Sequence, residues 1–279
     1  MHMIAKTLCT TFVTGSLAIS LVSAARAADA SAWSDDTRSA LRLIAGSNAS
    51  GATQLHAGVE IKMRPGWHTY WRYPGDSGVP PRFDFSGSEN LKSAKVLYPA
   101  PSLHSDEGGQ SLGYEGSVIF PVVVTAATRG KPVQLRLKVE YAVCEKLCVP
   151  AEGRVELPLG DATSSEDAAL KSAQAQVPEL VPAADVGLSA RRVDNGPKPL
   201  VMVDLTAPAG KPVQLFVEGP SPEWALPIPK PAQGAPAGHQ HFAFELDGLP
   251  PGVDPKGQFD LTFTLVGGDR PLEVKTHLD

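Results

Sequence analysis

The chain has 279 residues, a formal net charge of −5 at pH 7, and 26 glycines and 26 prolines. The negative balance argues against nucleic acid, whose binding depends on neutralising phosphates with lysine and arginine, and against docking on an anionic membrane surface. Abundant turn-forming residues and few long helical patterns favour β structure.

The first residues have the pattern of a secretory signal peptide. Lys6 gives a positive start, residues 8–22 are apolar and uncharged, and Ala25-Arg26-Ala27 is a small-x-small cleavage site. We expect cleavage after Ala27, which moves the net charge from −5 to −7 because Lys6 and Arg26 are lost. No later segment reaches the roughly 18 apolar residues of a spanning helix. We therefore expect a periplasmic protein without membrane insertion.

Residues 28–162 are predicted to form a first β-sandwich. The clearest strand is residues 133–141, where apolar and polar side chains alternate strictly, as in a sheet with one buried face. Short runs separated by Pro/Gly clusters favour an antiparallel sandwich. The other expected strands are residues 54–63, 95–98, 118–125 and 154–159.

Residues 163–185 are predicted to be a helix and linker, because residues 164–176 are rich in helix formers and Pro178 follows them. Strands are expected to resume in a second, smaller sandwich over residues 186–279. Its expected strands are residues 188–193, 200–205, 213–218, 241–246, 259–266 and 272–277. The predicted fold class is all-β, with two immunoglobulin-like antiparallel β-sandwich domains joined by a short helix.

Cys144 and Cys148 are the only cysteines left once Cys9 is removed with the signal segment. Two residues four apart in an extended strand lie about 13 Å apart, so a disulfide requires a turn between them. Closing so small a ring stabilises a protein by only about 2 kcal/mol, and two domains of this size have cores of their own. The pair is interpreted either as a redox device or as a structural staple.

Two other chemistries compete with these interpretations. The thiolates can hold Cu(I) or help to hold Zn(II) if Met63, His68 or His104 approaches in space. His239 and His241 alternate on a strand, which a solvated edge explains equally well. Residues 109–113 match the G-x-S-x-G pattern of a nucleophilic serine, but neither a strand before nor a helix after is expected, so this segment is interpreted as a glycine-rich loop.

Three ordered motifs resemble the amino-terminal periplasmic domain of the protein-disulfide reductase DsbD family, most closely its ScsB-related branch. They are residues 66–81 (GWHTYWRYPGDSGVPP), residues 98–101 (YPAP) with 113–121 (GYEGSVIFP), and residues 141–150 (YAVCEKLCVP). The likeness covers about residues 50–160.

The resemblance implies an immunoglobulin-like domain that relays reducing equivalents by dithiol–disulfide exchange. It implies that Cys148 forms the mixed disulfide with a partner and that Cys144 resolves it. A cap loop shields the pair in that family, and the matching stretch is about residues 105–116. Tyr114 is the expected covering ring, with Asp106 and Glu107 as acidic residues that tune access.

The chain departs from the family pattern in two ways. The reductase spaces its cysteines by five residues rather than three, and it continues into a membrane domain and a thioredoxin-like domain that are not found before Asp279. We therefore expect thioredoxin-like periplasmic partners and a separate membrane electron donor.

The predicted function is thiol–disulfide interchange through Cys144 and Cys148, with no cofactor and no resident metal. Tyr70, Trp67 and Trp71 are expected to pack in the core, and Asp76 to form a turn. The alternatives are a non-enzymatic binding module with a structural disulfide, and a periplasmic copper-binding or copper-tolerance factor.

Overall fold

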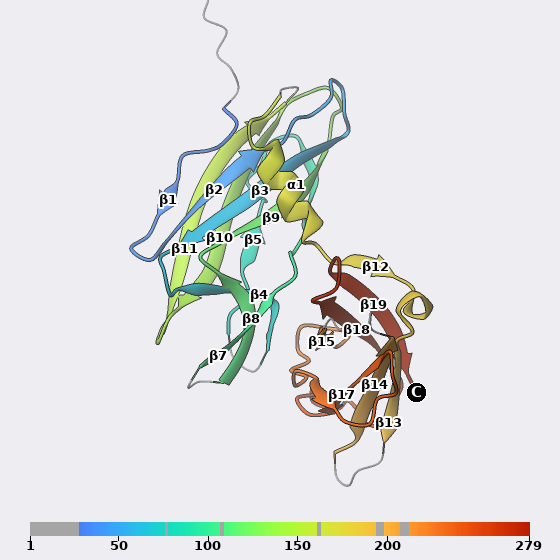
Figure 1. Ribbon diagram of the computed structural model, residues 1–279. Coiled ribbons are helices and arrows are strands. Elements are labelled where there is room, and N and C mark those ends of the chain that lie inside the picture. The colour runs from blue at the N-terminus through green and yellow to red at the C-terminus, as the bar shows by residue number, and fades with distance from the viewer. Residues whose placement is uncertain (1–27, 76–77, 107–108, 161–162, 194–197, 207–211) are drawn as a thin grey trace, which may run out of the picture.

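The structure is a computed structural model, and it describes residues 28–75, 78–106, 109–160, 163–193, 198–206 and 212–279. Almost all of its regular elements are strands, which confirms the predicted all-β class (Figure 1). The signal segment and the turn residue Asp76 lie outside the described residues.

The first group of strands forms two sheets that face each other. One sheet has the order β1-β2-β3-β9-β6, and the other has the order β11-β10-β4-β8-β7 with β5 paired to β10. The bounds are β1 Ser34–Asp35, β2 Ser39–Ala45, β3 Gln54–Met63, β4 His68–Gly75, β5 Arg82–Asp84, β6 Leu91–Val96, β7 Ser102–Asp106, β8 Gly109–Glu115, β9 Ser117–Ala126, β10 Val133–Cys144 and β11 Cys148–Leu159.

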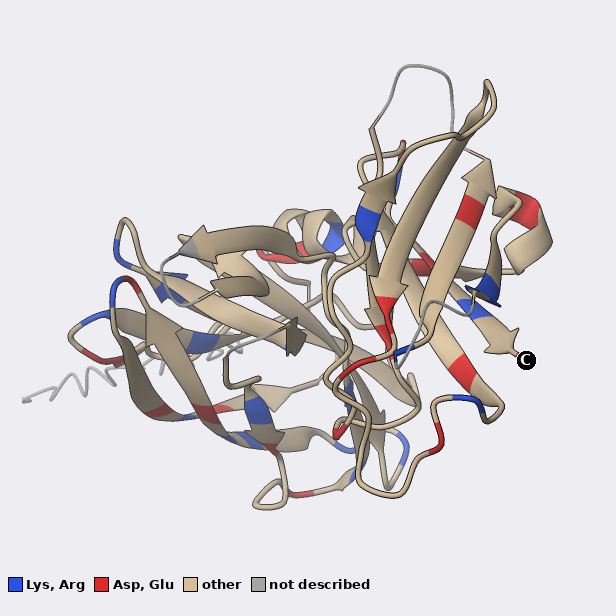
Figure 2. Cartoon of the chain, turned by 90° about the horizontal axis from the view of Figure 1, so that it is seen from below, with Lys and Arg blue, Asp and Glu red and all other residues tan. Residues whose placement is uncertain are grey.

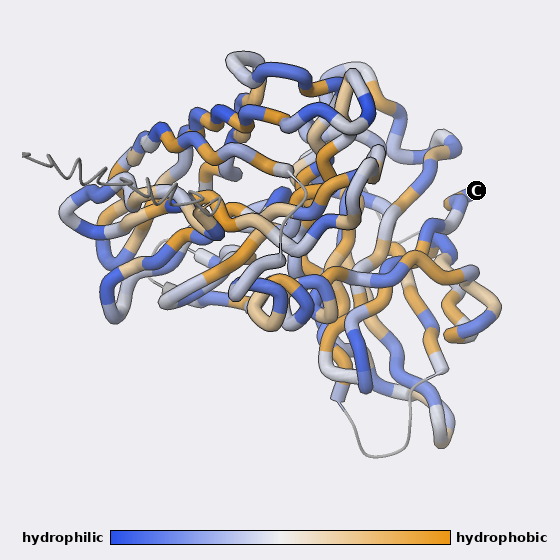
Figure 3. The backbone as a smooth tube through the Cα atoms, turned by 90° about the horizontal axis from the view of Figure 1, so that it is seen from above, coloured by the Kyte–Doolittle hydropathy of each residue, from blue (hydrophilic) through white to orange (hydrophobic). Residues whose placement is uncertain are grey.

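Alternation along the strands builds the core between these sheets. In β10 every odd residue from Val133 to Tyr141 is buried, while Glu140 on the opposite face is exposed. Figure 3 shows the same alternation of hydrophobic and hydrophilic residues along many strands. The predicted strand thus has the expected inner and outer faces, and it continues further, to Cys144.

The second group of strands also forms two sheets, and each of these has four strands. Their orders are β12-β19-β18-β15 and β13-β14-β17-β16. A separate core contains Val203, Leu261 and Phe263 among its buried residues. The bounds are β12 Glu179–Val181, β13 Ser189–Val193, β14 Leu200–Thr206, β15 Gln214–Glu218, β16 Lys230–Ala232, β17 His239–Glu245, β18 Phe259–Val266 and β19 Leu272–Leu278, with a 3₁₀ turn at Ala183–Val186.

Helix α1 (Asp167–Ala175) connects the two groups and lies against the sheet that contains β3 and β9 (Figure 1). Its buried residue is Leu170, and a Cβ placed at Gly58 of β3 would come within 2.7 Å of the Leu170 side chain. Ser47 donates to the Asp167 carboxylate through its backbone N–H at 2.7 Å. The helix is therefore fixed by one apolar contact and by hydrogen bonds at its start.

Several segments differ from the expected elements. Strands β4 and β2 were not predicted, and within the expected cap loop (residues 105–116) the described residues 105–106 and 109–115 belong to strands β7 and β8. Gly109–Gly113, interpreted as a glycine-rich loop, is part of β8. The glycine-rich segment is a strand because β8 is hydrogen-bonded on both sides, to β4 and to β7. Such cross-strand bonds can hold glycine in a strand despite its low β propensity.

Leu170→Ala is expected to lower the free energy of unfolding by about 2–3 kcal/mol, because it removes the apolar contact that holds α1 on the sheet. Denaturant titration followed by tryptophan fluorescence measures the change. Lys171→Ala, on the exposed side of the same helix, is the matched control. Equal stability of the two variants would contradict this role for Leu170.

Candidate functional site

A hairpin brings the two cysteines together. Strand β10 ends at Cys144, β11 begins at Cys148, and these two residues are direct cross-strand partners at the end of the ladder. Glu145, Lys146 and Leu147 form the turn between them. The Cα atoms lie 4.1 Å apart, and a disulfide joins the two side chains. The turn that the sequence required for pairing is therefore present.

The two halves of the disulfide differ in exposure. Cys144 is 2% exposed, whereas Cys148 is an exposed residue at the start of β11. Leu147, at the tip of the turn, is 75% exposed, which is unusual for a large apolar side chain in this protein. A molecule that approaches the hairpin tip therefore meets Cys148 and Leu147 before Cys144.

A tyrosine hydroxyl contacts both sulfur atoms. The Tyr70 Oη lies 2.7 Å from Cys144 Sγ and 3.0 Å from Cys148 Sγ. The Tyr70 side chain is 2% exposed and packs with Cys144 and Ala142 in a small buried cluster. A phenol hydroxyl can donate a hydrogen bond to a thiolate, so this contact favours the charged form of whichever sulfur is released.

Strand β4 holds Tyr70 at the disulfide. It pairs with the end of β10, where His68 lies opposite Cys144 and Thr69 opposite Val143. The Thr69 hydroxyl donates to the Ala142 carbonyl at 2.8 Å, which adds a buried side-chain link between the two strands. Backbone pairing between β4 and β10, the strand that carries Cys144, thus positions Tyr70.

Two histidines extend this cluster towards the β7–β8 hairpin. The ring of His68 stands edge-on to Tyr70, with 5.5 Å between centroids, and stacks on His104 of β7 at 4.9 Å. The first group of strands, β1 to β11, is called the first domain from here on, and the second group, β12 to β19, the second domain. The hairpin projects from the end of the first domain (Figure 1). The stacked rings therefore connect the hairpin to the strand that holds Tyr70.

The structure places Tyr114, the expected covering ring, inside the sandwich instead of over the sulfurs. Its hydroxyl donates to the Pro99 carbonyl at 2.7 Å, and its ring meets Phe120 edge-to-face at 5.3 Å. Burial raises the pKa of Tyr114 well above its ordinary value. The cause is register: Tyr114 is opposite Thr69, whereas Gly113 is opposite Tyr70, so the position of β8 that shares the face of Tyr70 carries no side chain.

Gly113 is required at that position. A Cβ there would come within 2.0 Å of the Thr69 carbonyl oxygen, which is backbone and cannot move aside independently. The other expected cap residues are less defined. Asp106 ends β7, where it pairs with Gly109, and Glu107 lies outside the described residues.

In the sequence, His68 and His104 stood out only as side chains that could approach the thiolates to hold a metal, and Tyr70 had no expected role at the disulfide. Tyr70 was assigned to packing, as were Trp71, which is fully buried, and Trp67, whose ring lies 5.3 Å from the Arg38 guanidinium. All three aromatic residues belong to the 66–81 motif. The signal that separates Tyr70 from its neighbours is the pairing of β4 with β10, which no sequence pattern reveals.

The histidine pair of the second domain lies away from the cysteine pair. His239 and His241 hydrogen-bond to separate oxygens of Asp204 in the second domain, at 2.8 and 2.5 Å. Within the described part of the chain, no group of three or more His, Cys, Asp or Glu side chains is arranged to hold a metal ion. Likewise, no helix in that part is long and apolar enough to cross a bilayer.

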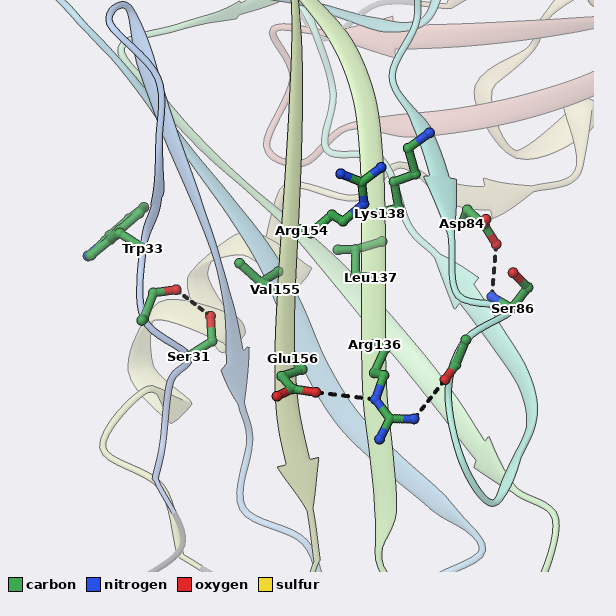
Figure 4. Close-up of a pocket in the computed structure, with 12 residues that line it drawn as sticks. Ser31, Trp33, Asp84, Ser86, Arg136, Leu137, Lys138, Arg154, Val155 and Glu156 are labelled. Atoms are coloured by element: carbon green, nitrogen blue, oxygen red, sulfur yellow. Dashed lines mark hydrogen bonds and ion pairs between the residues drawn. The ribbon is translucent and has the colours of Figure 1, made fainter.

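A pocket of about 600 Å³ lies on the outer face of β10 and β11 beside Trp33 (Figure 4). Its cations are already paired with carboxylates: Arg136 with Glu156 at 3.2 Å, and Lys138 with Glu152 at 3.4 Å. Figure 2 shows acidic and basic residues interspersed over this domain. We interpret the pocket as a solvated, ion-paired surface.

Two comparisons with known proteins found similarity to this chain. Residues 41–160 match the family model described as thiol:disulfide interchange protein DsbD, N-terminal. The crystal structure of the N-terminal periplasmic domain of ScsB from Proteus mirabilis is similar, with a TM-score of 0.68 and 18% sequence identity, over 90% of this chain and 98% of that chain. No curated protein sequence matches. The predicted resemblance is confirmed for residues 41–160 of the first domain. The fold of the ScsB domain is similar over both domains of this chain.

Tyr70→Phe is expected to raise the pKa of the more acidic cysteine thiol in the reduced protein by about one unit, because it removes the hydroxyl that stabilises a thiolate. The pH dependence of thiolate absorbance measures this pKa. Tyr114→Phe is the matched control, because it removes a buried hydroxyl that bonds Pro99 and not sulfur. A rise of similar size in both variants would contradict the assignment.

Proposed function

We propose that this protein, whose first domain is a thiol–disulfide interchange module of the DsbD amino-terminal type, relays reducing equivalents between redox partners in the periplasm. The observation that carries the proposal is the asymmetry of the disulfide: Cys148 is exposed, while Cys144 is buried against a hydroxyl. An exposed sulfur can be attacked, and a buried sulfur with a donor beside it can leave as a thiolate.

In the loading step, a thiolate of the electron donor attacks Cys148 Sγ. The Cys144–Cys148 bond breaks and a donor–Cys148 mixed disulfide forms, while Cys144 leaves as a thiolate that accepts the Tyr70 hydrogen bond. A second donor thiolate then attacks the donor's own sulfur in the mixed disulfide and releases Cys148. Two electrons pass to this protein, and the donor ends as a disulfide.

In the unloading step, the Cys148 thiolate attacks a partner disulfide, forms a mixed disulfide, and releases one partner sulfur as a thiolate. Cys144 then attacks Cys148 Sγ, which restores the disulfide of this protein and frees the second partner sulfur. The partner gains two electrons and takes up protons from solvent. Each step exchanges one sulfur–sulfur bond for another and requires no cofactor.

The proposed partners are thioredoxin-like periplasmic proteins, with a separate membrane protein as electron donor. Leu147, exposed beside Cys148, provides an apolar contact at the point of attack. The β7–β8 hairpin serves as the cap, with Asp106 at its end, and His104 connects it to the site. The similar ScsB domain is described as periplasmic, which supports the same location here.

The staple alternative has less support. The disulfide joins residues only four apart in sequence, so its loop is short and its contribution to stability is small, about 2 kcal/mol. The hairpin that carries it is already held by continuous pairing from Val133–Leu159 to Cys144–Cys148. A bond that adds little stability fits a pair that opens and closes.

Cys144→Ser is expected to accumulate a mixed disulfide between Cys148 and an oxidised thioredoxin-like protein, because the resolving sulfur is absent. Non-reducing electrophoresis with mass spectrometry identifies the trapped pair. Cys148→Ser is the matched control, and it is expected to trap at least about tenfold less, because Cys144 is buried.

Two outcomes would overturn the proposal. One is the absence of exchange in both variants together with a reduction potential below about −300 mV, which is typical of a structural disulfide. The other is tight Cu(I) uptake by the reduced protein that is lost in Cys144→Ser and is accompanied by no disulfide exchange, which would favour the copper-binding alternative.

A further inference from the structure

The backbone pairing of strand β4 with its neighbouring strands changes along its length. Its first residues pair with β10 at His68 and Thr69, and with β8 from His68 to Tyr70. The register with β8 then shifts, and pairing resumes at Gly75. Further along β10, the strand paired to it from this side is β5. The segment after Tyr70 is therefore released from the regular ladder of the first domain.

Arg72, which lies in this segment of β4, links it to the second domain. The guanidinium donates to Glu218 of β15 through Nε at 2.9 Å and Nη2 at 2.7 Å, and to Glu273 of β19 at 2.5 Å. The side chains are largely buried, with exposures of 29% for Arg72, 17% for Glu218 and 18% for Glu273. Paired donation from one planar guanidinium fixes direction as well as distance.

Neighbouring side chains reinforce the same contact. The Tyr73 hydroxyl donates to the Leu226 carbonyl of the second domain at 2.6 Å. The ring of Trp71 lies 6.4 Å from Phe216, which belongs to the core of the first domain although it is on β15. Three consecutive residues of β4 thus contact the second domain immediately after Tyr70.

We propose that Arg72 is a positioning residue for the disulfide, and that through it the second domain holds Tyr70 at the sulfurs. Arg72 lies two residues, or about 7 Å, from Tyr70 along an extended strand. A displacement of about 1 Å at Tyr70 would lengthen and weaken the hydrogen bonds from its hydroxyl to the sulfurs, which are 2.7 and 3.0 Å long. The inference rests on the proposed function, since it makes the second domain part of the redox site.

The charges explain why Arg72 is decisive in this contact. Burial opposes its charge, but hydrogen bonds and the charges of Glu218 and Glu273 outweigh that effect, so the pKa of Arg72 lies above its ordinary value. Without the guanidinium, the Glu218 and Glu273 carboxylates of the second domain would be left largely buried and unpaired against β4. The cost of keeping these charges out of water would favour opening of the contact between the second domain and β4.

The test measures the dithiol–disulfide equilibrium constant against glutathione in the full mature chain. Arg72→Gln is expected to shift it about fivefold towards the disulfide, or about 20 mV to more negative potential, because the reduced form loses the Tyr70 donor. Tyr70→Phe is expected to shift it in the same direction. The double variant is expected to match Tyr70→Phe alone, because Arg72 acts through Tyr70.

Glu218→Gln/Glu273→Gln approaches the same contact from the second domain and is expected to give the shift of Arg72→Gln. Arg42→Gln is the matched control: it breaks the ion pairs with Glu60 and Glu166 within the first domain and around α1, and is expected to leave the constant unchanged. If Arg72→Gln does not fold, the equilibrium constants of Arg72→Lys and of Glu218→Gln/Glu273→Gln test the proposal instead.

The proposal is overturned if folded Arg72→Gln and Glu218→Gln/Glu273→Gln have the wild-type constant, or if the Arg72→Gln and Tyr70→Phe shifts simply add. Failure of the proposed function is a separate result. It would appear as the absence of protein trapping by Cys144→Ser, while the glutathione constant stays measurable in every variant.

Discussion

Strand β10 pairs with β11 on one side and with the start of β4 on the other, so Cys144 has Cys148 and His68 as its two cross-strand neighbours. This three-strand register determines the rest of the site. It places both sulfurs at one end of a sheet, leaves Cys148 exposed, and brings Tyr70 under the disulfide. A shift of one residue in the β4–β10 ladder would turn Tyr70 to the opposite face, and the same shift in the β10–β11 ladder would take Cys148 out of register with Cys144.

The architecture combines a rigid base with an accessible tip. The base is the sandwich core and the continuous β10–β11 ladder, and the tip is a turn of three residues that ends in exposed Leu147. Thiol exchange requires the attacking sulfur, the central sulfur and the leaving sulfur to line up. A fixed pair that projects from a sheet allows a partner to supply that alignment without rearranging the fold.

Much of the fold could be predicted, but the environment of the disulfide could not. Strict alternation from Val133 to Tyr141 indicated a half-buried strand, and the cysteine motif indicated that Cys144 and Cys148 form a pair. Strand β4 was missed because its tryptophan and tyrosines are apolar on both faces and run into Pro74-Gly75. Tyr114 was preferred to Tyr70 because motif position does not show register, and only the Tyr70–Gly113 pairing reveals which ring faces the sulfurs.

The position of the Tyr70 hydroxyl between the two sulfurs has a consequence for reversibility. One donor within 3.0 Å of both atoms can stabilise whichever sulfur carries the charge as the bond breaks or forms. Opening and closing of the disulfide therefore use the same hydrogen-bond donor. In the proposed relay, the direction of net electron flow would then depend on the reduction potentials of the partner proteins relative to that of this disulfide.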